Sequence, residues 1–251
     1  MRDQAPMKTD NNTWVNGIIE QKYHGWVGMD KIIDIFIREC IVPGGVVLDV
    51  GCGKRSPLAC YRNDLRLLVG ADLELRDLRE NMDVEALVLA DGSCGLPFLS
   101  NTFDLILSKT VIEHLVDPLR FFREMYRVLK PGGSFVWATS NLHSLPIFVS
   151  RLTPITVHKW VYRQIYGKNL NFDQFPTYYR ANTKQALHKK LTQTGFLKIV
   201  FNTANWPFYF AINRPLFLFF LLIHRLSDWL GLEFLQAHLI GVYRKEASNS
   251  E

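Results

Sequence analysis

The sequence lacks a hydrophobic run long enough to cross a membrane. Its longest wholly apolar run, residues 216–223, has eight residues, whereas a membrane-spanning helix needs about 20. Residues 1–13 are polar and lack the charged-then-apolar pattern of a secretory signal. We therefore expect a cytoplasmic protein rather than an integral membrane or exported one.

The sequence is also poor in cysteine. The four cysteines, Cys40, Cys52, Cys60 and Cys94, show no short paired spacing, which is the pattern that structural zinc sites require. A chain of 251 residues can bury a sizeable core without disulfides. We therefore expect free thiols and no bound metal.

Acidic residues are scarce in one segment. Residues 151–198 hold nine lysines and arginines against one acidic residue, a charge of +8, whereas the whole chain carries +5. A basic segment suits an anionic substrate, a membrane surface or nucleic acid, and an ordinary solvated basic face is an equally good interpretation. No RNA- or DNA-binding module is recognisable in the sequence, so we do not expect a nucleic-acid partner.

The first half of the sequence alternates apolar runs of strand length with helical patterns. The runs are residues 46–50, 67–71, 86–90, 103–108 and 134–139, followed later by 196–202 and 239–244. Continuous apolar runs are typical of strands that are buried on both faces. The clearest helix covers residues 117–129, with Asp117 as its cap and Pro118 at its first position. This alternation predicts an α/β protein with a doubly wound, Rossmann-like parallel sheet.

Acidic residues lie at the ends of three successive predicted strands. Asp49 lies near the end of the first strand, ahead of a glycine-containing turn that lets the backbone approach a ligand. Asp72 ends the second strand, where a carboxylate can accept hydrogen bonds from both hydroxyls of a ribose. Asp91 follows the third strand and can address an adenine amino group. Parallel strands end at one edge of a sheet, so these acids predict a nucleotide-like ligand at that edge.

Five segments, in this order, resemble the motifs of class I S-adenosylmethionine-dependent methyltransferases, particularly their small-molecule branch. They are VVLDVGCG (46–53), VGADLE (69–74), ADGSCGLPF (90–98), FDLILSKTVIEHL (103–115) and RVLKPGGSF (127–135). The resemblance implies a seven-stranded sheet with an antiparallel last strand. It also implies S-adenosylmethionine as cofactor and methyl transfer by in-line displacement to a small-molecule acceptor.

The same resemblance implies roles for residues along the sheet edge. Asp49 and the glycines after it would lie near the methionine part of the cofactor, Asp72 at the ribose, and Asp91 at the adenine. The expected cofactor-binding residues are Asp49, Gly51, Cys52, Gly53, Asp72, Leu73, Asp91, Gly92 and Ser108. The chain departs from the family at residues 54–56, Lys-Arg-Ser, where another glycine is common. This tripeptide would either crowd the turn or place a cation beside the cofactor carboxylate.

Catalysis of methyl transfer depends mainly on alignment, but a hydroxyl acceptor also benefits from a general base. His114, just after the fourth strand, is the candidate base, and a turn residue with local hydrogen bonds is the alternative interpretation. His143, after the fifth strand, is a second candidate. Residues 172–183 are expected to form a lid on the acceptor side or, alternatively, to pack on the sheet. The candidate substrate-binding residues in this segment are Tyr178, Tyr179 and Arg180.

We expect four regions along the chain. They are an N-terminal helical cap (1–40), the cofactor-binding core (41–140), a basic and aromatic insertion on the acceptor side (141–182), and a C-terminal helix with the last two strands (183–246). An aromatic insertion, residues 206–235, interrupts the last region. It could be additional core, a wall for a lipophilic or lipid- or glycan-linked acceptor, or a helix that lies at the inner face of a membrane as a peripheral contact.

Two other functions stay open on the sequence alone. A domain of this type could bind S-adenosylmethionine, or nothing, and act as a binding or interaction protein without catalysis. A NAD(P)-dependent oxidoreductase on a Rossmann-like fold is the other alternative, but such enzymes need a third glycine where this chain has Ser56.

Overall fold

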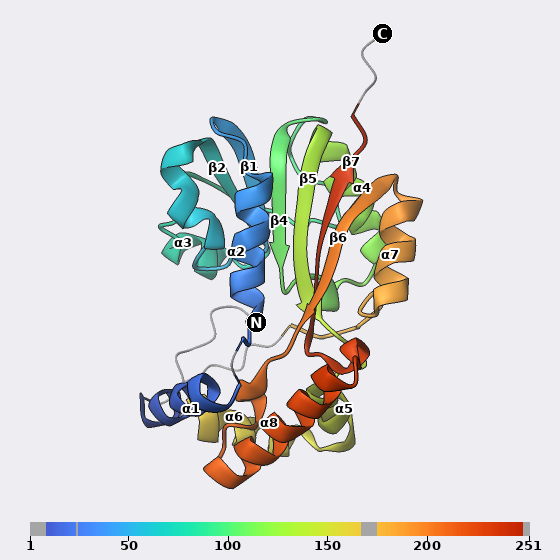
Figure 1. Ribbon diagram of the computed structural model, residues 1–251. Coiled ribbons are helices and arrows are strands. Elements are labelled where there is room, and N and C mark those ends of the chain that lie inside the picture. The colour runs from blue at the N-terminus through green and yellow to red at the C-terminus, as the bar shows by residue number, and fades with distance from the viewer. Residues whose placement is uncertain (1–8, 24, 167–174, 248–251) are drawn as a thin grey trace.

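A single seven-stranded sheet forms the centre of the computed structural model, which describes residues 9–23, 25–166 and 175–247. The strand order is β3-β2-β1-β4-β5-β7-β6 (Figure 1). The strands are β1 (Gly45–Val50), β2 (Leu65–Asp72), β3 (Ala86–Leu89), β4 (Phe103–Lys109), β5 (Leu129–Ser140), β6 (Phe196–Ala204) and β7 (His238–Lys245). Strands β1 to β5 pair in parallel, whereas β7 is antiparallel to both β5 and β6. The predicted Rossmann-like sheet with an antiparallel last strand is confirmed.

Helices cover both faces of this sheet, which is why its central strands read as continuous apolar runs. Helix α2 (Met29–Cys40) packs on one face, while α4 (Pro118–Val128) and α7 (Lys184–Gln193) cover the other (Figure 1). The remaining helices are α1 (Thr9–Lys22), α3 (Leu75–Glu80), α5 (Leu145–Leu152), α6 (Ile155–Tyr166) and α8 (Arg214–Trp229). Short 3-10 turns are η1 (Pro57–Asp64), η2 (Ile112–His114), η3 (Pro207–Phe210) and η4 (Glu233–Leu235).

Helix α4 begins where its sequence predicts. The Asp117 carboxylate accepts hydrogen bonds from the backbone N–H groups of Leu119 and Arg120, at 3.1 and 3.2 Å, and Pro118 takes the first helical position. Strand β5, by contrast, begins at Leu129, five residues before the predicted strand. Leu129 pairs with Phe103, and the register then shifts before Ser134 pairs with Leu105. The residues between them form an irregularity within the strand instead of a separate loop.

A third layer lies beyond the end of the sheet toward which the arrowheads of β4 and β5 point (Figure 1). We call α1, α5, α6, η3 and α8 the cap. Its small core joins α1 to α8, because Val15 and Ile19 pack with Phe217 and Leu221. Tyr23 also donates a hydrogen bond to Asp228, which is 205 residues away in the sequence. The helical, aromatic cap therefore lies beyond the edge of the sheet at which the parallel strands end.

The expected regions map onto these layers as follows. The N-terminal region, 1–40, contributes α1 to the cap and α2 to a face of the sheet. The insertion 141–182 contributes α5 and α6, but its residues 167–174 lie outside the described part of the chain. Within the described ranges, no helix combines the length and the apolar character needed to cross a bilayer.

Candidate active site

Asp49 lies at the end of β1 and is only 2% exposed. Burial raises the pKa of Asp49 to about 7, and the negative charge of Asp72 acts in the same direction. The hydroxyl of Ser56, which donates to Asp49 Oδ2 at 2.6 Å, and the charge of Lys109 oppose this rise. Ser56, where an oxidoreductase turn would have its third glycine, thus donates a hydrogen bond to the buried carboxyl group of Asp49.

The two cations before Ser56 are held by acids near α3. Lys54 pairs with Glu80 of α3, and Arg55 lies 3.8 Å from Asp83. The backbone N–H of Ser56 also donates to Asp83, at 2.9 Å. These contacts hold the turn after β1 in place without crowding it. Both cations pair with acids other than the three at the strand ends, Asp49, Asp72 and Asp91.

Gly51 and Gly53 both adopt positive φ angles, +79° and +54°. A Cβ on Gly51 would lie 2.2 Å from Cγ2 of Val111, in the loop after β4. Gly92 is needed for a different reason, since a Cβ there would lie 2.8 Å from the ring of Phe121 in the core. These glycines allow the strand-end loops to pack closely on one another and on α4.

Asp72 at the end of β2 is 3% exposed and joins two loops. Its Oδ2 accepts from the backbone N–H of Gly53 at 2.9 Å, and its Oδ1 accepts from that of Glu74 at 2.8 Å. These two hydrogen bonds fix the orientation of the Asp72 carboxylate at the strand end. Leu73 beside it is 56% exposed and offers an apolar surface at the same strand end.

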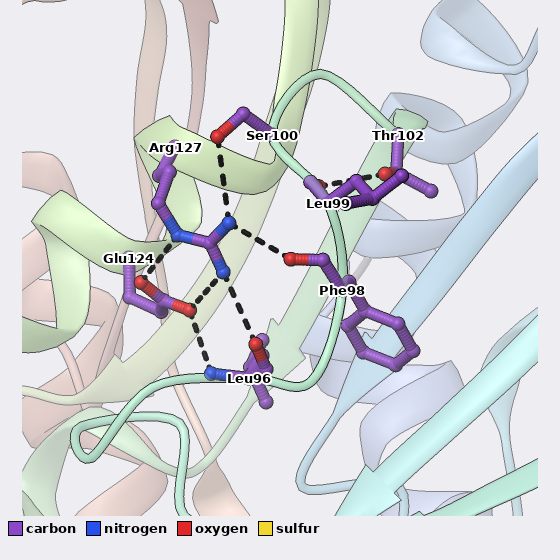
Figure 2. Close-up of polar contacts among 7 residues, drawn as sticks. All are labelled: Leu96, Phe98, Leu99, Ser100, Thr102, Glu124 and Arg127. Atoms are coloured by element: carbon purple, nitrogen blue, oxygen red, sulfur yellow. Dashed lines mark hydrogen bonds and ion pairs between the residues drawn. The ribbon is translucent and has the colours of Figure 1, made fainter.

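Asp91 is half-buried after β3 and accepts from Ser93 N at 2.7 Å and from Cys94 Sγ at 3.2 Å. The loop that follows is clamped to α4 by an ion pair between Glu124 and Arg127, as Figure 2 shows. Glu124 accepts from the Leu96 backbone N–H at 2.6 Å, and Arg127 donates to the carbonyl oxygens of Leu96 and Phe98 at 3.1 and 2.8 Å. The hydrogen-bonded Arg127 keeps the pKa of Glu124 below its usual value.

Two of the expected cofactor residues have inward-facing side chains. Ser108 near the end of β4 is fully buried, and its hydroxyl has no hydrogen-bond partner among the described residues. The Cys52 sulfur is buried against β2, close enough to leave no room for a Cβ on Gly70. Any contact of these two residues with a ligand would therefore use the backbone, or a rearranged Ser108 hydroxyl.

His114 is half-buried in η2 after β4, and its Nδ1 lies 3.1 Å from the carbonyl oxygen of Pro176. A carbonyl oxygen can only accept, so the ring donates through Nδ1. In the neutral imidazole this leaves the lone pair on Nε2. The Phe175 ring lies beside the imidazole, with ring centroids 6.0 Å apart. The contact with Pro176 therefore sets the tautomer of the neutral His114 ring.

The segment that holds His114 also carries the candidate substrate residues. Backbone N–H groups of Tyr178 and Tyr179 donate to the carbonyl of Glu113 at 2.8 and 3.2 Å, and Arg180 donates to the carbonyl of Val116 at 2.6 Å. The structure thus brings the described part of the expected lid, from Phe175 onward, onto the loop after β4. Residues 172–174 of that lid lie outside the described ranges. Tyr178 is 42% exposed, whereas the Arg180 guanidinium is engaged by Val116 and lies over the Tyr178 ring.

Glu113 has a larger structural role than its sequence indicates. It is 3% exposed, and its carboxylate accepts from Thr139 Oγ1 at 2.7 Å and Ser140 Oγ at 3.2 Å. Asn182 donates in turn to Thr139 Oγ1 at 2.7 Å. Glu113 therefore ties the end of β5 to the loop that carries His114. Only the fourth motif, in which Glu113 precedes His114, signals this role in the sequence.

Two other histidines differ from His114. His143 is exposed, and no partner of its imidazole is found among the described residues. His238 at the start of β7 is 1% exposed, and burial lowers its pKa to about 4, so its imidazole is neutral near pH 7. No sequence motif contains His238, and tertiary packing alone places it at this end of the sheet. The described part of the chain contains no cluster of three or more metal-ligating side chains.

The part of the chain that carries the candidate site resembles known proteins. Residues 48–137 match the family described as "Methyltransferase domain". The chain is 32% identical over 104 residues to cycloartenol-C-24-methyltransferase 1 of Oryza sativa subsp. japonica, covering 38% of this chain and 30% of that protein. It is 33% identical over 136 residues to malonyl-(acyl-carrier protein) O-methyltransferase of Marinomonas sp., covering 50% of each. The chain thus spans half or less of the length of these curated relatives.

A solved structure shares the fold. It is the Haemonchus contortus phosphoethanolamine N-methyltransferase 2 in complex with S-adenosyl-L-methionine. The TM-score is 0.54 at 18% sequence identity, over 94% of this chain and 57% of that chain. The family match runs from within β1 to within β5, so it includes part of these two strands, all of β2, β3 and β4, and the segments that carry Asp49, Asp72, Asp91 and His114.

Proposed function

We propose that this chain, which carries a class I S-adenosylmethionine-dependent methyltransferase domain, transfers a methyl group from S-adenosylmethionine to a small-molecule acceptor. One observation carries the proposal. The segment that matches the family is the segment whose strand ends bring together Asp49, Asp72 and Asp91. The segment that matches the family is therefore also the segment that contains the candidate cofactor-binding acids.

The residues present fit this cofactor. Asp72 is oriented by two backbone N–H groups, and a carboxylate can accept hydrogen bonds from the hydroxyls of a ribose. The ionised form of Asp49, which burial disfavours, suits the cationic methionine part. Asp91 and the exposed Leu73 lie at the ends of β3 and β2, where the adenine is expected. When bound, the cofactor supplies an electrophilic methyl group on a sulfonium.

The chain itself supplies alignment and a proton acceptor. His114 donates through Nδ1 to Pro176, so Nε2 can accept the proton of an acceptor hydroxyl. Glu113, held by Thr139 and Ser140, keeps the loop that carries His114 in place. Tyr178, exposed on the segment that docks on this loop, is the substrate contact that the geometry favours most. His143 and Arg180 receive less support. The His143 imidazole is exposed and has no partner among the described residues, and the Arg180 guanidinium donates to the Val116 carbonyl.

The acceptor belongs, in this proposal, to the lipophilic or lipid- or glycan-linked class. The cap lies over the carboxyl ends of the strands, and its core consists of apolar and aromatic side chains such as Trp14, Phe208 and Phe217 (Figure 1). An acceptor with a long apolar part would enter between this cap and the sheet. If the acceptor is of this class, we expect the protein to be cytoplasmic and to contact the inner face of a membrane peripherally.

The oxidoreductase alternative loses its main support in this structure. A third glycine would let a dinucleotide pyrophosphate approach the helix that follows, but Ser56 is 6% exposed and its hydroxyl is committed to Asp49. The turn is followed by the 3-10 segment η1 and not by a long α-helix.

Calorimetry with S-adenosylmethionine and with its demethylated product tests the cofactor assignment. We expect both to bind the wild-type chain, and we expect Asp72→Asn to weaken both. Transfer of a labelled methyl group to a cell extract, partitioned between organic and aqueous phases, then tests the reaction. Label in the organic phase supports a lipophilic acceptor. Binding without any transfer would assign the chain to the non-catalytic class, and absence of binding to either ligand would overturn the proposal.

A further inference from the structure

Helix α8 presents an apolar face to solvent on the side opposite to its packed face. Its packed face contains Phe217, Leu221 and His224. At about 100° per residue, six exposed apolar side chains fall within about 120° of arc on the other side. These residues, which we call the outer face, are Leu218, Phe219, Leu222, Leu226, Trp229 and Leu230. Trp229 is 81% exposed. No charged residue of α8 falls inside this arc.

Such a face is unusual for a helix on the surface of a protein in water. A surface helix normally turns polar residues to solvent, and contiguous exposed apolar patches mark interaction sites. The opposite side of α8 is already occupied by α1, through the contact of Trp14 with Phe217 at a centroid distance of 5.3 Å. The outer face is therefore not needed for the cap core. Two other cap helices also carry exposed apolar residues, including Phe148 and Leu152 of α5 and Trp160 of α6.

The charges around the outer face are arranged asymmetrically. Arg214 and Arg225 are both exposed and lie on one flank of the apolar arc. The acid of α8, Asp228, is turned toward α1, since it accepts from Tyr23 and, at 3.0 Å, from Asn205 Nδ2. Two cations beside an apolar face match the headgroup and acyl layers of an anionic bilayer.

The length of α8 and its tryptophan support the same partner. Sixteen residues make a helix of about 24 Å, shorter than the hydrocarbon core of about 30 Å. Tryptophan rings favour the boundary between membrane and water. A helix with these properties lies in the plane of the interface and does not cross it.

We propose that the outer face of α8 docks this protein on an anionic lipid bilayer. The inference rests on the proposed function, because the cap lies at the carboxyl ends of the strands, where a lipophilic acceptor would enter (Figure 1). Docking would turn that end of the molecule toward the bilayer. A second copy of the chain is the less suitable occupant, since like faces in contact would bring Arg214 and Arg225 of both copies together, whereas lipid phosphates would neutralise them.

Cosedimentation with vesicles tests this surface. We expect the wild-type chain to pellet with vesicles of phosphatidylcholine and phosphatidylglycerol, and much less with phosphatidylcholine alone. The triple variant Phe219→Ser, Leu222→Ser, Leu226→Ser should bind about tenfold more weakly or worse. Its matched control, Met82→Ser with Leu99→Ser, changes two apolar residues outside the cap that are 88% and 83% exposed, and should bind like wild type.

The arginines are tested separately. Each arginine near an anionic surface is expected to change the partition coefficient about fivefold at low salt. Arg214→Gln with Arg225→Gln should therefore weaken binding to the anionic vesicles by about 25-fold, with little change on phosphatidylcholine. The fluorescence of wild-type protein should also shift to shorter wavelength on vesicle binding, and Trp229→Phe should remove most of that shift.

Three results would overturn the proposal. They are no pelleting of wild type, equal pelleting of the triple variant and wild type, and a wild-type dimer in sedimentation velocity that the triple variant converts to monomer. Calorimetry of each variant with S-adenosylmethionine, without vesicles, separates the two proposals. If the wild-type chain does not bind S-adenosylmethionine, the methyltransferase function is refuted. The docking surface is judged separately, by the vesicle-binding results alone.

Discussion

Replacing Gly51 by alanine tests whether the turn after β1 must pack on the loop after β4. The new Cβ would lie 2.2 Å from Val111 Cγ2, whereas carbon atoms prefer about 3.5–4.0 Å. Relieving such an overlap by moving packed groups costs about 1–3 kcal/mol. The φ of +79° adds about 1–2 kcal/mol for a residue with a Cβ. We therefore expect Gly51→Ala to lower the free energy of unfolding by about 2–5 kcal/mol.

A double-mutant cycle separates the two contributions. Val111→Ala removes the Cγ2 atom that Gly51→Ala would strike, so the double variant should lose only the backbone part of the Gly51→Ala cost. The expected coupling free energy is about 1–3 kcal/mol. Gly44→Ala is a matched control, because Gly44 has a φ of +71° but a Cβ there would meet nothing within 4 Å. It should cost only about 1–2 kcal/mol.

Urea denaturation of the four members of the cycle and of Gly44→Ala measures these values, with calorimetry of S-adenosylmethionine binding on the same samples. Cofactor affinity should fall with Gly51→Ala and recover in part in the double variant, because the turn between Asp49 and Gly53 moves with the overlap. If Gly51→Ala costs no more than Gly44→Ala, or if its effect adds to that of Val111→Ala, the close packing of these two loops is refuted.

Three further outcomes follow from the site. His114→Gln should slow methyl transfer to a hydroxyl acceptor by about 10²–10⁴-fold and change cofactor affinity little; unchanged turnover would remove His114 as the base. The pKa of Asp49, raised to about 7, predicts that cofactor affinity rises with pH up to about 7 and then levels. It also predicts that the free energy of unfolding falls as pH rises from the usual carboxyl range through about 7, because the folded state holds a proton that the unfolded state has released. Both trends should vanish in Asp49→Asn, and their persistence would assign them to another group. Arg127→Lys should cost about 1–2 kcal/mol of stability in urea, since lysine cannot bind Glu124 in two places while also holding the Leu96 and Phe98 carbonyls, and a cost near zero would contradict the clamp.

Much of the sheet and the position of the candidate site at its edge could be predicted, because the signals are local. Continuous apolar runs marked the five parallel strands, β-rich segments at 196–202 and 239–244 marked the last two, and Asp117 with Pro118 marked the start of α4. The positions of Asp49, Asp72 and Asp91 at one edge follow from the parallel order alone, since consecutive parallel strands end on the same side. The early start of β5 could not be predicted, because the pairing of Leu129 with Phe103 depends on a partner strand and not on local pattern.

The basic segment shows where sequence counting misleads. Residues 151–198 carry a charge of +8, but the structure divides them between two places. Arg163 lies in the cap, while Lys189 and Lys198 lie on α7 and β6, which belong to the sheet. Lys184 approaches Glu233 at 3.7 Å, and Arg180 binds a backbone carbonyl. Charge that is contiguous in sequence is therefore not contiguous on the surface, and Arg214 and Arg225, which lie outside this segment, flank the apolar face of α8.

The sequence by itself determined the class of the fold and the edge of the sheet at which the candidate site lies, because apolar periodicity, caps and strand ends are properties of neighbouring residues. Only the tertiary structure decided three hydrogen bonds. They join His114 to the Pro176 carbonyl, the Ser56 hydroxyl to the Asp49 carboxyl group, and Tyr23, just after α1, to Asp228 of α8, 205 residues away. These contacts depend on packing between distant segments. The longest apolar run, residues 216–223, lies within α8 in the structure, and this helix has one face in the cap and the other toward solvent.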